Sequence, residues 1–97
     1  MTPLPDPRTT AARALLADQH ARLTAALASI EGDRLAICER NLCRRLLGKV
    51  EWWQCKPDGA VVDALGFMGP NGSGPAIDDA CRQAAFAASF ADVRRAA

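Results

Sequence analysis

The chain has 97 residues, of which 49% are hydrophobic and 24% are charged, and its formal net charge is +1. This length predicts a single small domain over residues 1–97 with a modest core. A charge so near zero argues against a function driven by bulk attraction to nucleic acid or to a membrane surface. The charge is uneven, however: residues 34–56 carry six basic and two acidic side chains, whereas residues 57–81 carry four acidic side chains and no basic one.

The start of the chain is predicted to be a flexible, proline-containing lead-in over residues 1–6. It holds no apolar stretch of the length found in secretory signal peptides. No apolar run in the chain approaches the roughly 20 residues that a membrane-spanning helix needs. We therefore expect a cytoplasmic protein without a membrane partner, whose four cysteines are reduced rather than paired.

A first helix is predicted to begin at Asp6-Pro7, because Asp can cap a helix and Pro suits the first helical position. Thr9 or Thr10 is the alternative cap. The spacing of the larger side chains that follow is helical and defines one face: Leu16, His20, Leu23, Leu27 and Ile30. Gly32 is expected to end the helix in the left-handed conformation, with Asp33 capping the next helix. So short a connection predicts an antiparallel helical hairpin.

The second helix is predicted to start near Arg34 and to be clearly amphipathic. Its apolar side gathers Leu35, Leu42, Cys43, Leu46 and Val50. Its opposite side is basic and gathers Arg34, Arg40, Asn41, Arg44, Arg45 and Lys49. The end of this helix is left open, because Gly48 is a plausible stop while the helical pattern can also run on to Trp53.

Lys56-Pro57-Asp58-Gly59 has the residues of a tight turn, with Pro at the second position and Gly at the fourth. Because β-forming residues flank it on both sides, we expect a central β-hairpin at about 50–67. The fold class is therefore mainly α (α+β), with an N-terminal helical hairpin, this β-hairpin and a C-terminal helix. The core face of the β-hairpin would carry Trp53, Cys55, Val61 and Leu65, with Phe67 beyond them, and its outer face Trp52, Gln54, Lys56, Val62 and Ala64.

The adjacent tryptophans are informative because neighbouring residues cannot share a face on a strand or on a helix. If the segment is a β-hairpin, Trp53 lies on the more apolar face. If the second helix continues instead, Trp53 falls within its apolar stripe and Trp52 among the arginines. Both interpretations place Trp53 toward the core and Trp52 outside or at an edge. An outward Trp beside arginines either covers a core edge or anchors a partner, since Trp and Arg are enriched at interface hot spots.

A glycine- and proline-rich loop is predicted over residues 68–74, followed by a helix that starts at Pro75. Gly69 and Gly74 have the spacing of a phosphate-binding loop, but Pro75 stands where that motif requires Lys. Asp78 and Asp79 are expected in the first turn of the helix, where its dipole favours them. This last helix is apolar on two sides, one with Ile77, Cys81, Ala84 and Ala88 and the other with Phe86, Phe90 and Val93. Which side is buried stays open, and the other side would contact a partner or a second copy of the chain.

No motif in the chain specifies a reaction or a cofactor. The cysteines Cys38, Cys43, Cys55 and Cys81 lack the paired spacing of structural zinc sites, so we expect no bound metal. His20 is interpreted as a core or core-edge residue rather than as a partner of a nucleophilic cysteine. We therefore do not expect an enzyme.

The preferred function is a non-catalytic protein-binding module of the inhibitor or adaptor type. Small size and the lack of a catalytic motif are shared by accessory inhibitors of phages and other mobile elements, such as anti-CRISPR proteins. The alternative is a nucleic-acid-binding regulator, in which the basic side of the second helix contacts phosphates and Trp52 stacks on a base. A homodimer through the C-terminal helix is a further expectation. The candidate partner-binding residues are Arg34, Arg40, Arg44, Arg45, Lys49, Trp52, Phe86 and Phe90.

Overall fold

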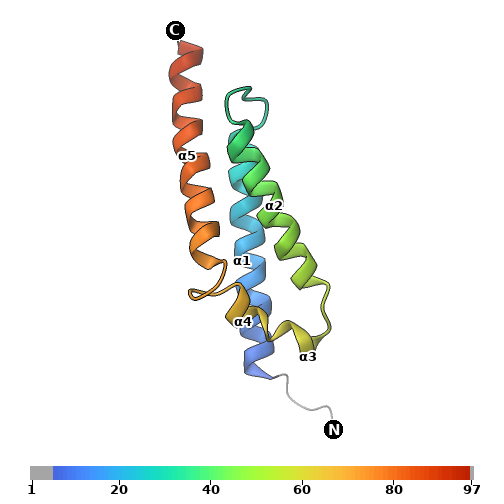
Figure 1. Ribbon diagram of the computed structural model, residues 1–97. Helices are drawn as coiled ribbons and strands as arrows, with labels where there is room; N and C mark the ends of the chain where they lie inside the picture. Colours follow the sequence, from blue (N-terminus) through green and yellow to red (C-terminus); the bar gives the residue numbers. More distant parts are fainter. Residues whose placement is uncertain (1–5, 97) are drawn as a thin grey trace.

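The computed structural model describes residues 6–96, except for the side chains of residue 92 and residues 94–96. Apart from Asp6, the predicted lead-in lies outside the described residues. The elements in chain order are α1 (Pro7–Ser29), α2 (Ile37–Gln54), α3 (Asp58–Val61), α4 (Ala64–Phe67) and α5 (Gly74–Ala96). Figure 1 shows α1 and α2 as an antiparallel pair, α5 alongside them, and the short α3 and α4 closing one end.

The prediction of a central β-hairpin is wrong, because residues 6–96 contain no strand and the segment 50–67 consists of the end of α2, the short helices α3 and α4, and the turns between them. The second helix runs on through both tryptophans to Gln54, and Pro57 is the N-cap of α3 rather than the second residue of a hairpin turn. Packing decides against the local β-propensity, since Val61, Ala64 and Met68 are fully buried. Their spacings of 3 and 4 put all three on one side of a helical path. Mainly α is the part of the predicted fold class that fits.

The start of α1 forms as its capping residue predicts, whereas the helix ends earlier than predicted, at Ser29 with Ile30 as its C-cap. The Asp6 carboxylate accepts a hydrogen bond from the backbone N–H of Arg8 at 2.9 Å, which lowers the pKa of Asp6. This N-cap is therefore Asp6 rather than Thr9 or Thr10. At the other end, Gly32 has a φ of +78°, the left-handed conformation that favours glycine.

The second helix begins three residues later than predicted. Asp33 does not cap it: its carboxylate accepts from the backbone N–H of Leu35 at 3.0 Å and so holds a turn before the helix. Ala36 is the N-cap. Leu35, predicted on the apolar side, is consequently 73% exposed.

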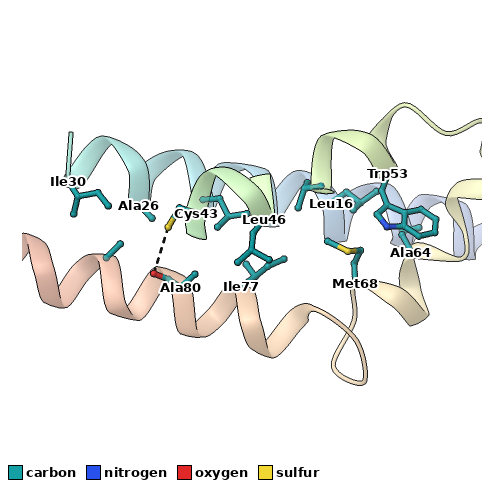
Figure 2. Packing of buried hydrophobic residues seen from close by; sticks show 14 of the residues in the cluster. Leu16, Ala26, Ile30, Cys43, Leu46, Trp53, Ala64, Met68, Ile77 and Ala80 are labelled. Carbon is teal, nitrogen blue, oxygen red and sulfur yellow. Dashed lines mark hydrogen bonds between the residues drawn. The ribbon is translucent and has the colours of Figure 1, made fainter. Parts of the chain in front are cut away.

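The core is a long seam between α1, α2 and α5, shown in Figure 2. Leu16, Leu23 and Ile30 contribute from α1 as predicted, whereas His20 and Leu27 are only partly buried. From α2, the buried side chains are Cys43, Leu46, Val50 and Trp53, and from α5 they include Ile77, Ala80 and Ala84. The small alanines let α5 approach closely, so that the Cys43 thiol lies 3.9 Å from the carbonyl oxygen of Ala80.

The molecule is elongated, with a radius of gyration of 16.0 Å, compared with about 13 Å for a compact domain of 100 residues. Figure 1 shows the cause: α5 extends past the connection between α1 and α2. The alanine side of α5 is the buried one, which settles the alternative that the sequence left open. Phe86, Phe90 and Val93 are exposed.

Candidate partner-binding surface

The two tryptophans lie as the sequence predicts. Trp53 is 8% exposed and belongs to the core, whereas Trp52 is 55% exposed. Their rings meet edge to face, with centroids 5.1 Å apart and an interplanar angle of 85°. The buried ring therefore supports the exposed one in a geometry that aromatic pairs favour.

Phe67 extends this pair into an aromatic cluster of Trp52, Trp53 and Phe67. Its ring stacks on Trp53 at 5.6 Å, yet it is 63% exposed, so its predicted position beyond a core face is wrong. Cys55 is exposed and Ala64 is buried, which also reverses their predicted faces. The Lys56 ammonium lies 3.9 Å from the centre of the Trp52 ring, a cation–π contact.

Side chains from α1 fix the end of α2 that carries the tryptophans. The Arg13 guanidinium donates to the carbonyl oxygen of Gln54 at 3.0 Å, one of the carbonyls left free at a helix C-terminus. It also donates to the carbonyl oxygen of Lys56, just beyond the helix, at 2.9 Å. It also pairs with the Asp58 carboxylate at 2.9 Å. Arg13 thus joins α1 to the end of α2 and to α3. Its contacts fix the position of the helix end that carries Trp52.

The predicted basic side of the second helix is only partly assembled. Arg44 and Arg45 project from the middle of α2 and are exposed. Arg34 lies before the helix starts, and Arg40 is turned back to donate to the carbonyl oxygen of Asp33. The Lys49 ammonium donates to Ser73 Oγ at 2.7 Å. Of the predicted basic residues, Arg44 and Arg45 are therefore the pair that shares the solvent side of α2 with Trp52.

We define the outer face of α2 by exposed residues that share one side of the helix at 100° per residue: Ile37, Asn41, Arg44, Arg45, Gly48 and Trp52. Arg44 lies at the edge of this face, because it also lines a hollow that includes Leu27 of α1 and Glu31. Sequence reasoning missed two of these residues. Ile37 is 53% exposed at the first turn of the helix. Gly48 was considered only as a helix stop, yet it lies inside α2, and a Cβ built on it meets nothing within 4 Å.

Replacing Gly48 by Ala should stabilise the isolated protein. A glycine inside a helix costs roughly 0.5–1 kcal/mol relative to Ala, and no contact in the chain needs the missing Cβ. The melting temperature, followed by circular dichroism at 222 nm, should rise by about 3–6 °C for a domain of this size. A fall instead would show that Gly48 has a role within the fold.

Phe86 and Phe90 form a separate exposed pair on α5. Their rings meet edge to face with centroids 4.8 Å apart. Trp52 is at the C-terminal end of α2, and Phe86 and Phe90 are in the C-terminal half of α5. Figure 1 shows that these two helix ends point to opposite ends of the molecule. The predicted partner-binding residues are therefore not one patch.

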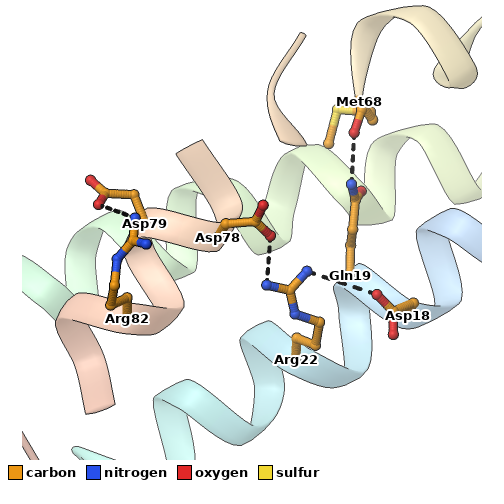
Figure 3. A network of polar contacts seen from close by, with 7 residues as sticks. All are labelled: Asp18, Gln19, Arg22, Met68, Asp78, Asp79 and Arg82. Carbon is orange, nitrogen blue, oxygen red and sulfur yellow. Dashed lines mark hydrogen bonds and ion pairs between the residues drawn. The ribbon is translucent and has the colours of Figure 1, made fainter. Parts of the chain in front are cut away.

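The acidic residues at the start of α5 have structural partners, shown in Figure 3. Because α5 begins at Gly74, Asp78 and Asp79 lie beyond its first turn, contrary to prediction. Asp78 pairs with Arg22 of α1 at 2.6 Å. Arg82 and Gln83 donate to Asp79 and lower the pKa of its carboxyl. A few residues away, the buried Gln19 donates to the carbonyl oxygen of Met68 at 2.7 Å, a core contact that sequence reasoning missed.

The residues with chemical potential are scattered. His20 is half-buried, and its Nε2 lies 3.8 Å from a Glu51 carboxylate oxygen rather than against a cysteine. Burial raises the pKa of the Cys43 and Cys81 thiols, which disfavours the nucleophilic thiolate. Cys38 and Cys55 are exposed. Among the side chains that the structure describes, no three of His, Cys, Asp or Glu are grouped so that they could hold a metal ion.

None of the helices in the described part of the chain has both the length and the apolar character needed to cross a membrane. The chain matches no protein-family model, and comparisons with curated proteins and with solved structures give no match. The candidate functional site is therefore the outer face of α2 with its surroundings.

Proposed function

We propose that the protein is a non-catalytic protein-binding module of the inhibitor or adaptor type, acting in the cytoplasm, and that Trp52 anchors its partner. The exposure of Trp52 on a fixed helix end is the observation that carries the proposal. A tryptophan that is 55% exposed leaves much of a large apolar ring in water, and burying that ring in an interface is favourable. The ring is already oriented by Trp53 and Lys56, so little side-chain freedom is lost on binding.

Two flanking features suit an anchor. Phe67 offers a second exposed ring close by, and a shallow hollow next to it is lined by Lys49, Gly66, Phe67, Asn71, Gly72 and Ser73. Arg44 and Arg45 stand on the same side of α2 as Trp52. Interfaces enrich this combination of Trp, Phe and Arg.

The test is capture of partners from a nuclease-treated lysate of the producing cell on immobilised protein, followed by affinity measurement with the purified partner. Trp52→Ala should weaken binding by at least about 2 kcal/mol, roughly thirtyfold. Phe86→Ala is the matched control, because Phe86 is an aromatic residue of similar exposure, 66%, on another helix. Equal affinity of the wild-type and Trp52→Ala proteins would refute the proposal.

The basic residues need a variant that leaves the fold alone. Arg40 helps to hold the turn before α2, so the charge reversal is confined to Arg44→Glu and Arg45→Glu, both exposed. This double variant should keep the helical circular dichroism of the wild type and lose partner binding. Unchanged binding would show that the two arginines do not contact the partner and only form part of a solvated helix surface.

Salt and nuclease separate this proposal from the alternative of a nucleic-acid-binding regulator. Binding to nucleic acid falls steeply as salt rises, because phosphate contacts release counterions. Anchoring through an apolar ring depends far less on salt.

Phe86 and Phe90 are proposed as the contact of a homodimer through α5, and Phe86→Ala should then change sedimentation without changing partner affinity.

A further inference from the structure

The arginines on the outer face of α2 are not in salt bridges among the described side chains, although Glu31 lines the same hollow as Arg44. The two acidic residues of α2 have other contacts or are partly buried. Glu51 faces His20, and Glu39 is partly buried. Lys49 and Lys56 contact neutral groups, the hydroxyl of Ser73 and the ring of Trp52. The solvent side of α2 therefore carries more positive than negative charge, which favours a negatively charged partner.

Apolar side chains lie at both ends of this basic stretch. Ile37 stands in the first turn of α2 and Trp52 in the last, and both are more than half exposed. At 1.5 Å per residue, they are about 22 Å apart along the helix axis. A partner helix of about four turns spans this distance and can place an apolar residue at each end.

Gly48 lies between the arginines and Trp52, where a close approach would take place. The glycine weakens α2, and nothing in the chain uses the space that it leaves. A glycine on a helix surface allows the backbone of a neighbouring helix to come near. An outside helix accounts for this residue, whereas contacts to phosphates would not require it.

We propose that the outer face of α2 binds an acidic amphipathic helix of a protein partner. Carboxylates of that helix pair with Arg44 and Arg45, apolar side chains at its two ends contact Ile37 and Trp52, and its backbone approaches α2 at Gly48. This inference rests on the proposed function and names the chemistry of the partner.

The test uses defined probes in fluorescence anisotropy with the full-length protein. The first is a fluorescein-labelled, helix-forming peptide of about 16 residues, long enough to reach from Ile37 to Trp52, with Leu and Phe at the two ends of one face and Glu between them. The second is the same peptide with Gln in place of Glu, and the third is a single-stranded oligothymidine. The Glu peptide should bind at least tenfold more tightly than the Gln peptide, and the oligothymidine should not bind.

Two variants locate the peptide on the protein. Gly48→Leu keeps a good helix former in α2 but fills the space at the proposed approach, and it should weaken binding of the Glu peptide at least tenfold. Gly59→Leu is the matched control on α3, where a Cβ also meets nothing within 4 Å, and it should bind normally. Arg44→Glu with Arg45→Glu should abolish the preference for the Glu peptide.

Several outcomes would overturn the inference. Equal binding of the two peptides would show that the partner need not be acidic. Binding of neither peptide would show that the outer face of α2 does not bind a helix of this kind. Binding of the oligothymidine alone would favour nucleic acid. The proposed function is judged separately: a captured protein partner that is lost with Trp52→Ala but is indifferent to Arg44 and Arg45 would support the module while excluding an acidic helix.

Discussion

Replacing Trp53 by Ala should lower the free energy of unfolding by about 3–5 kcal/mol, because the large side chain leaves a cavity that the helices cannot close. Trp53 is 8% exposed and joins α2 to the region of α4, where its ring stacks on Phe67. The loss is a large part of the roughly 5–15 kcal/mol that stabilises a domain. Chemical denaturation followed by circular dichroism measures it directly.

Trp52→Ala is the control for this prediction. It removes a ring of the same size from the neighbouring position, but a ring that is 55% exposed. Its cost should be about 1 kcal/mol, as is usual outside a packed core. Trp53 should therefore control the stability and Trp52 the affinity. If Trp52→Ala were the more destabilising change, the outer face of α2 would be wrongly assigned, and the proposed anchor would fail with it.

The orientation of the tryptophans could be predicted without knowing the secondary structure. Both the helical and the extended period put Trp53 on the side of the apolar residues and Trp52 on the other side. In the structure both tryptophans lie in α2, with Trp53 buried and Trp52 exposed as predicted. The predicted directions of Trp52 and Trp53 are therefore correct, although the predicted β-hairpin is wrong.

The β-hairpin failed because its signals were local. Pro57, Asp58 and Gly59 suit a tight turn, but the same residues also start a short helix, with Pro57 before its first residue. The deciding information was the helical spacing of Val61, Ala64 and Met68, which pack on the core. Such spacing in two short helices is hard to distinguish from a half-buried strand by pattern alone.

The buried stripe of α1 shows a smaller error of the same kind. Large side chains at Leu16, Leu23 and Ile30 set the period correctly. His20 and Leu27 were chosen to complete it, whereas Gln19 and Ala26, one position earlier in each case, are the buried residues. A hydrogen bond to the Met68 carbonyl lets the polar Gln19 occupy a core position, and no pattern of apolar residues could reveal that bond.

The residues on the outer face of α2 could be predicted only in part, because their positions depend on where the helix begins. Arg44 and Arg45 follow from helical periodicity once the helix exists. Arg34 and Arg40 depend on where the helix starts, and the turn held by Asp33 moves that start to Ile37. Gly48 was considered as a stop signal because glycine is a poor helix former. The structure shows instead that Gly48 lies inside α2 and that its surroundings are open.

Replacing Gly72 by Ala should destabilise the protein by about 3 kcal/mol, at the upper end of the usual cost of overpacking. A Cβ built on Gly72 would lie 2.2 Å from the carbonyl oxygen of Phe67 and 2.6 Å from that of Gly66. These are backbone atoms, so no side chain can rotate away and the loop itself must move. The same loop holds Ser73, whose N–H donates to the Phe67 carbonyl at 2.9 Å and whose hydroxyl accepts from Lys49.

Gly66→Ala is the matched control, because a Cβ at Gly66 meets nothing within 4 Å. Thermal unfolding should show a large drop in melting temperature for Gly72→Ala and little change for Gly66→Ala. The predicted difference arises from space rather than from backbone conformation, since Gly32 is the glycine with a positive φ among the described residues. If Gly72→Ala were as stable as the wild type, the close packing of the 68–73 connection against the end of α4 would be refuted. The hollow beside Phe67 and Lys49 would then not be lined by a rigid loop.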